Sequence, residues 1–144
     1  MIIGGKKVGY GEKTLTIAEG CSNICKYLDD LPIFIETVAK TGASGVKCQL
    51  YLPEHFPEAE QSSKYQTMFP RPLFKDFVTI SHDNGLLCGA SVFDDEAVDL
   101  CVDCGADYLK LATREWHNDN LYQRCCSTGL PIIRSYDWSS GIFK

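Results

Sequence analysis

The stretch "GADYLKLATRE" (residues 105–115) joins a helix end to a buried strand and places a charged residue inside that strand. Gly105 follows a helical pattern, and a glycine just past a helix is typical of a left-handed helix terminator. The apolar residues after it predict a buried strand, yet Lys110 lies in the middle of that strand. Because a buried ammonium group destabilises a fold unless it is paired or binds an anion, Lys110 is a candidate functional residue.

The junction between helix and strand recurs along the chain, and this repetition indicates the fold class. Four helical patterns end in glycine, at residues 29–42, 72–85, 94–105 and 118–129. Short apolar strands are predicted at residues 14–19, 45–50, 86–93, 108–113 and 131–136. Strands that alternate with helices are typical of a parallel sheet with right-handed crossovers. The one long irregular connection, residues 51–72, is interpreted as a lid or a binding loop.

Five parallel strands fit either an open doubly wound sheet or part of a closed barrel, and the pattern alone does not choose between them. A complete eight-stranded βα barrel needs about 250 residues, more than the 144 present. In both architectures ligands bind at the C-terminal ends of the strands. The polar residues that the sequence places there are Glu19, Gln49, Ser91, Thr113, Glu115 and Ser135.

A second lysine lies inside a predicted strand, in "SGVKCQLYL" (residues 44–52). Lys47 and Gln49 alternate with apolar residues there, so Cys48 should face away from them and pack under a helix. Two strands with a lysine in the middle predict one anion between Lys47 and Lys110. The alternative is a structural ion pair, in which Glu19 or Glu115 is the partner of a lysine.

Composition limits the classes of function. A chain with 44% hydrophobic and 23% charged residues has the composition of a globular protein and the length of one domain, residues 1–144. A net charge of -5 argues against a nucleic-acid or anionic-membrane surface. The N-terminus lacks a continuous apolar leader, and nowhere do 18 apolar residues follow one another. We therefore expect a cytoplasmic protein.

The eight cysteines are expected to be reduced thiols, because the chain lacks the features of a small secreted disulfide scaffold. Cys101 and Cys104 form a CxxC pattern, and Cys125 and Cys126 follow about twenty residues later. A zinc site needs four converging ligands, whereas the first pair lies within a helical pattern and the adjacent second pair points apart. Buried thiols that pack as small hydrophobes are the preferred interpretation.

Several motifs together resemble the N-terminal half of the sialic acid (N-acetylneuraminate) synthase family. They are, in order, "LTIAEG", "GVKCQL", "GASVFDDEAVDLCVDCGADYLKLATRE" and "TGLPIIRS". The family usually has IAE, VKFQ, STPFD, FKIASGE and a fifth strand similar to GKPVILSTG. The similarity extends over residues 14–138, and an ordered set of motifs is far more specific than any single one. It implies a TIM-barrel-like fold with about five of the eight strands present, a truncated barrel.

The resemblance also implies a reaction, the condensation of phosphoenolpyruvate with an N-acyl-mannosamine-type amino-sugar to a nonulosonic acid with release of phosphate. In family terms the acidic active-site residues are Glu19 and Glu115. Lys47 and Lys110 match the lysines that hold phosphoenolpyruvate, and Gln49 belongs to the same motif as Lys47. The hydroxyl contacts to this substrate match Ser91, Thr113 and Ser135.

The chain departs from the family in features that affect activity. The family's divalent metal is held by histidines of later strands, to which His55, His82 and His117 do not correspond, so no metal ligand is identified in this chain. The glycine before the acidic residue of the fourth strand is replaced by Arg114. Strands six to eight are absent, so we expect the chain alone to be inactive, and its open sheet edge to favour self-association or a complementing chain. The alternative function is a non-catalytic pseudoenzyme or fragment that binds an anion or a partner chain.

Overall fold

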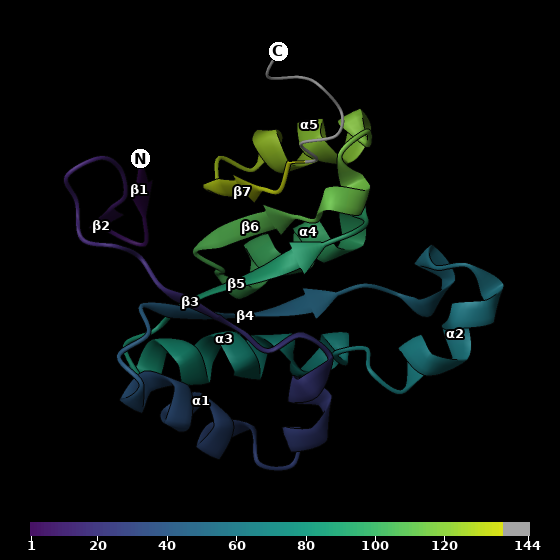
Figure 1. Cartoon of the computed structure of the whole chain (residues 1–144), viewed down its shortest axis with the longest axis horizontal. Helices are drawn as coiled ribbons and strands as arrows, with labels where there is room; N and C mark the ends of the chain where they lie inside the picture. Colours follow the sequence, from purple (N-terminus) through teal and green to yellow (C-terminus); the bar gives the residue numbers. More distant parts are fainter. Residues whose placement is uncertain (137–144) are drawn as a thin grey trace.

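A five-stranded parallel sheet forms the centre of the protein in the computed structural model, which describes residues 1–136 apart from the side chain of Ser22. The strands are β3 (Ile17–Glu19), β4 (Gly45–Leu50), β5 (Leu87–Val92), β6 (Tyr108–Leu111) and β7 (Ile132–Arg134). They pair in the order of the sequence and curl into a half-barrel (Figure 1). Residues 137 and 138, the last two of the predicted family match, lie outside the described range.

The arrangement of the helices decides between the two predicted architectures. The four predicted helices are present as α1 (Leu31–Lys40), α3 (Phe74–Asp83), α4 (Asp95–Cys104) and α5 (Asp119–Ser127). Their buried residues join a single core with one face of the sheet. A doubly wound sheet would reverse its strand order and carry helices on both faces, so the truncated barrel is confirmed. The glycines after these helices, Gly42, Gly85, Gly105 and Gly129, all have positive φ, as predicted.

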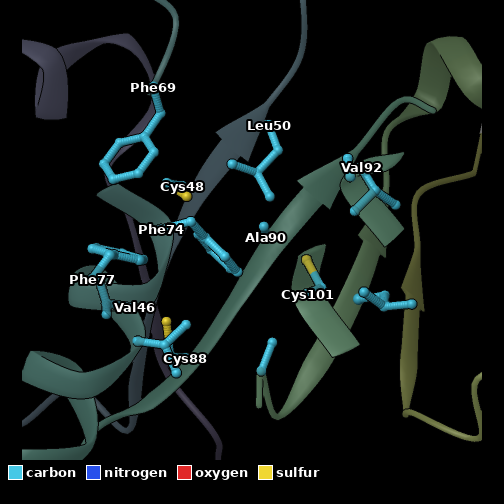
Figure 2. Close-up of a cluster of buried hydrophobic side chains, with 14 of the residues drawn as sticks. Val46, Cys48, Leu50, Phe69, Phe74, Phe77, Cys88, Ala90, Val92 and Cys101 are labelled. Carbon is cyan, nitrogen blue, oxygen red and sulfur yellow. The ribbon is translucent and has the colours of Figure 1, made fainter. Parts of the chain in front are cut away.

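Strand alternation separates the apolar core from the inner face of the half-barrel. Val46, Cys48 and Leu50 of β4 are fully buried and point toward the helices, as Figure 2 shows with their neighbours from β5 and from the residues around α3. The position predicted for Cys48, under a helix, is therefore confirmed. Lys47 and Gln49 are only partly buried because they lie on the opposite face of the same strand.

The inner face is closed at the N-terminal end of the sheet by a hairpin that sequence analysis did not predict. The two-residue strands β1 (Ile2–Ile3) and β2 (Lys6–Lys7) pair antiparallel. Ile3 is buried against Leu87 and Tyr108, which belong to β5 and β6. Two residues are too few for an alternating pattern to be recognised, so the hairpin left no signal in the sequence.

The connection at residues 51–72 is not irregular throughout, so that prediction was wrong in part. It contains the helix α2 (Glu58–Tyr65) and two 3-10 turns, Pro53–His55 and Arg71–Leu73. No residue of α2 is buried, so the helix has no apolar face from which a period could be detected. It protrudes at the C-terminal end of the sheet, where lids and binding loops lie (Figure 1).

Within residues 1–136, no helix combines the length and the apolar character needed to cross a membrane.

The inner face depends on a glycine that faces an aromatic ring. Gly89 pairs in register with both Lys47 and Tyr108, and a Cβ atom at Gly89 would lie 2.5 Å from the Tyr108 ring. The ring can therefore lie across β5, where the Tyr108 hydroxyl donates to the Val46 carbonyl at 3.2 Å. Burial raises the pKa of this hydroxyl, so it remains a donor.

We expect the substitution Gly89→Ala to lower the free energy of unfolding by about 1–3 kcal/mol, because the added methyl group overpacks the contact with Tyr108. Chemical denaturation followed by circular dichroism measures the change. In a Tyr108→Leu background the same substitution should cost clearly less. An equal loss in both backgrounds would show that the ring is not the obstacle.

Candidate functional site

Three of the predicted site residues are in direct contact on the inner face. The Lys47 ammonium group forms an ion pair with the Glu19 carboxylate of the neighbouring strand. It also donates a hydrogen bond of 3.1 Å to Oγ of Ser91, which is buried on β5. The Lys47 side chain is 12% exposed and that of Glu19 is 37% exposed. The ion pair that the sequence left open as an alternative is therefore present for Lys47.

Lys110 lies in the same cluster but has different surroundings. It lies on β6, pairs in register with Ser91 of β5 and is half-buried. Within residues 1–136 its ammonium group makes no ion pair and no hydrogen bond. The cluster of Glu19, Lys47, Ser91 and Lys110 thus holds two ammonium groups against one carboxylate. This excess of positive charge is the feature that an anion would neutralise.

Burial controls the protonation of both lysines. Removal from water lowers the pKa of Lys47 to about 8, with repulsion from Lys110 as the second cause. The Glu19 carboxylate beside Lys47 opposes this shift, because an adjacent anion favours the ammonium form. Burial also lowers the pKa of Lys110. Both groups therefore lose their protons more easily than exposed lysines do.

Cys21 connects Glu19 to Gln49 and was not selected by sequence analysis. Its backbone N–H donates to Glu19 Oε1 at 2.8 Å, and its sulfur accepts a hydrogen bond of 3.3 Å from Gln49 Nε2. Among the described residues it is the only non-glycine with positive φ, at 42°, a conformation that costs of order 1–3 kcal/mol and concentrates at functional sites. Its one sequence signal is its place two residues after the end of β3.

Glu115 lies after β6 and is not paired with either lysine. It is 12% exposed, and its carboxylate accepts from Asn118 at 2.9 Å and contacts the Arg114 guanidinium at 3.2 Å. The strand predicted over residues 108–113 ends at Leu111, so Thr113 and Glu115 belong to the following 3-10 turn. The predicted strand extended too far because Ala112 and Thr113 continue the run of apolar and β-branched residues in the sequence.

The remaining predicted residues surround the cluster. Thr113 is exposed, and Ser135 is half-buried directly after β7, with its N–H bonded to the Leu111 carbonyl at 3.0 Å. No structural observation yet assigns a ligand contact to either hydroxyl. They stay predictions.

Arg114 attaches the segment at residues 51–72 to the mouth of the half-barrel. Its guanidinium donates to the His55 carbonyl and lies 4.3 Å from the centre of the Phe56 ring. Lys64 of α2 also lies 4.3 Å from the centre of this ring. Such cation–π contacts contribute about 0.5–2 kcal/mol each. The residue that replaces a family glycine therefore links the predicted lid to the turn that carries Glu115.

The described residues do not fit the divalent metal expected in the full-length family. Within residues 1–136, no group of three or more His, Cys, Asp or Glu side chains converges in a way that could hold a metal ion. The eight cysteines all lie in this range and none of them forms a disulfide there, and Cys101 and Cys125 are fully buried.

Comparison with known proteins identifies the family to which the cluster belongs. The model of the NeuB family matches residues 34–140, well over half of the chain. The chain belongs to the NeuB family. The predicted resemblance to sialic acid synthases is thereby confirmed, and Lys47 and Lys110 lie within the part of the chain that the NeuB model matches.

The individual proteins that resemble this chain are longer than it is. The N-acetylneuraminic acid (sialic acid) synthetase of Leptospira borgpetersenii, crystallised in complex with citrate, is 25% identical, with a TM-score of 0.85 over 93% of this chain and 48% of its own. The spore coat polysaccharide biosynthesis protein spsE of Bacillus subtilis shares the fold, with a TM-score of 0.78, 23% identity, and coverage of 94% and 39%. An uncharacterized protein of Methanocaldococcus jannaschii is 27% identical over 92% of this chain and 40% of its own length. The chain spans less than half of each relative.

The pKa of Lys47 predicts a pH dependence of stability. Between about pH 8 and the ordinary lysine pKa of 10.5, the unfolded chain binds more protons at this position than the folded chain, so stability should rise with pH. We expect the free energy of unfolding of the wild type to increase relative to that of Lys47→Met across this window. Denaturation at several pH values measures the difference. Replacement of the exposed Lys75 by Met is the control, and a parallel profile for both variants would contradict the assignment.

Proposed function

We propose that the chain binds a small organic anion between Lys47 and Lys110 and that phosphoenolpyruvate is this ligand. The observation that carries the proposal is Lys110, a half-buried ammonium group with no partner within residues 1–136. It lies beside Lys47, whose single carboxylate partner leaves the cluster with excess positive charge. Membership of the NeuB family supports a sialic acid synthase-like role for these residues.

The charge balance of the cluster suits this ligand. Phosphoenolpyruvate carries a phosphate and a carboxylate, and two ammonium groups in a low-dielectric site can bind one each. Ser91 is within hydrogen-bond distance of Lys47 and offers a hydroxyl, as do Thr113 and Ser135 on the neighbouring turns. Gln49 adds an amide. In this proposal they complete the binding of the anion.

The proposed reaction is that of the family, condensation of phosphoenolpyruvate with an N-acyl-mannosamine-type sugar to a nonulosonic acid with release of phosphate. Glu19 and Glu115 are the proposed acidic catalytic residues, since carboxylates near the reacting atoms can transfer protons and stabilise positive charge. We propose that this step belongs to carbohydrate biosynthesis in the cytoplasm. Because the chain spans less than half of its relatives, the complete reaction also involves regions that this chain does not contain.

A non-catalytic role is the second candidate, and two observations favour it. The ion pair with Glu19 neutralises Lys47 without any ligand, and Arg114 occupies the turn beside Glu115 and pairs with its carboxylate. Both contacts restrain groups that catalysis would use. In this role the chain binds an anion or a partner chain without turnover.

Replacement of Lys110 tests the anion site most directly, because Lys110→Met leaves the ion pair of Lys47 intact. We expect phosphate, phosphoenolpyruvate and citrate to raise the thermal midpoint of the wild type, since a ligand at a hundred times its Kd stabilises the folded state by about 2.7 kcal/mol. Lys110→Met should lose this shift and keep or increase its stability without ligand, because one of two repelling charges is removed. Lys110→Arg keeps the charge and should keep most of the shift.

The substitution Lys47→Met should affect stability differently from Lys110→Met. It removes a charge that burial disfavours but leaves the Glu19 carboxylate without its ammonium partner, so the ligand shift should be lost and the thermal midpoint without ligand should lie below that of Lys110→Met. Differential scanning fluorimetry of the four proteins, with and without each anion, measures both effects. A wild type that no anion stabilises, or a Lys110→Met variant that responds as the wild type does, would contradict the proposed function.

A further inference from the structure

The two lysines of the cluster differ in what surrounds their nitrogen atoms, and this difference suggests a covalent role for one of them. Lys47 has a carboxylate in contact and a hydroxyl at 3.1 Å. Lys110 has neither within residues 1–136. A carboxylate and a hydroxyl beside an amine are the groups that move protons when an amine adds to a carbonyl. Lys110 has no such proton-transferring group beside it within residues 1–136, so its role is to bind a negative charge.

The surroundings of Lys47 also produce a neutral amine, which is the nucleophilic form of lysine. Burial and the nearby Lys110 lower its pKa, so the neutral amine is reached more easily than in an exposed lysine. Desolvation and a neighbouring cation are the two effects that activate lysines for imine formation, and both act here. The Tyr108 ring lies over Gly89, the register partner of Lys47, and forms an apolar wall beside it.

We propose that Lys47 forms a reversible imine with a small 2-oxo acid whose carboxylate is held by Lys110. The neutral Lys47 nitrogen attacks the keto carbon and forms a C–N bond, and the carbonyl oxygen takes up a proton. Glu19 transfers the protons from the nitrogen to this oxygen, which leaves as water when the C–O bond breaks. The products are an imine and one water molecule, so no oxidant or reductant takes part. The role of Lys110 rests on the proposed anion site, whereas the imine at Lys47 goes beyond it.

The ligand class follows from the two different functions that the lysines have in this proposal. One lysine binds a carboxylate, and the other attacks a carbonyl. Together they select a compound whose carboxylate and carbonyl are neighbours. The Ser91 hydroxyl, within reach of Lys47 Nζ, can donate to the oxygen of the attacked carbonyl. Simple aldehydes and ketones lack the carboxylate and should react less.

Borohydride trapping tests the inference with pyruvate as the probe. Sodium borohydride reduces an imine to a stable secondary amine, so the folded chain is incubated with pyruvate, reduced, and mapped by peptide mass spectrometry. We expect the adduct on Lys47 to exceed that on any exposed lysine by at least about tenfold, because its neutral fraction near pH 7 is far larger. Peptide mapping separates this adduct from any at the amino terminus. Acetone, which lacks the carboxylate, should give clearly less product.

Two variants separate this inference from the anion site. Lys47→Arg keeps the positive charge but cannot form an imine, so it should lose the adduct completely, whereas its thermal shift with phosphate should fall only in part. Lys110→Met should give less adduct with both probes, because loss of the neighbouring cation raises the pKa of Lys47, and the loss should be several-fold larger for pyruvate, whose carboxylate also loses its partner. Thermal scans show that each variant is folded.

The outcomes are distinct. A wild type that phosphate stabilises but that gives no adduct, or gives adducts spread evenly over the exposed lysines, overturns the imine and leaves the anion site standing. An adduct at Lys47 that is unaffected by Lys110→Met overturns the role of Lys110. If the wild type shows no thermal shift and no adduct, both proposals are overturned.

Discussion

The repulsion between two ammonium groups on the inner face of one parallel sheet is the constraint around which the structure is arranged. Lys47 and Lys110 lie on strands separated by β5 alone, and burial and mutual repulsion both favour loss of a proton from Lys47. One carboxylate, that of Glu19, lies against Lys47. The remaining charge is what an anion must neutralise, so the same feature that weakens the fold defines the candidate site.

The rest of the fold supports this arrangement by placing the apolar residues elsewhere. The opposite faces of β4, β5 and β6 are buried under α1, α3, α4 and α5, and that core holds the strands in register. On the inner face, the pair of Gly89 and Tyr108 and the N-terminal hairpin close the N-terminal end of the sheet. The polar groups are left at the C-terminal ends of the strands, where ligands bind in barrels.

The departures from the family motifs affect the mouth of the half-barrel, at the C-terminal ends of the strands, more than the N-terminal end of the sheet. Cys21 and Arg114 occupy the turns after β3 and β6, and each ties a predicted acidic residue to another segment. Cys21 restrains Glu19, and Arg114 joins Glu115 to the segment at residues 51–72. The proposed anion site and the two proposed acidic residues are therefore held by different contacts. Lys47, Lys110 and Glu115 lie within residues 34–140, which the NeuB family model matches.

The sequence by itself determined the elements in which apolar residues recur with a clear period. In β4 apolar and polar residues alternate, and glycines mark the ends of α1, α3, α4 and α5. It also indicated that Lys47 and Lys110 would lie near one another, since parallel strands present their C-terminal ends at one edge. Only the tertiary structure decided that the sheet curls with helices on one face, that Glu19 pairs with Lys47 rather than Lys110, and that Arg114 takes Glu115. These outcomes depend on distances between side chains far apart in the chain, and a local pattern carries no information about such distances. For the same reason α2 and the strained Cys21 left almost no signal: neither buries an apolar face whose period the sequence could reveal.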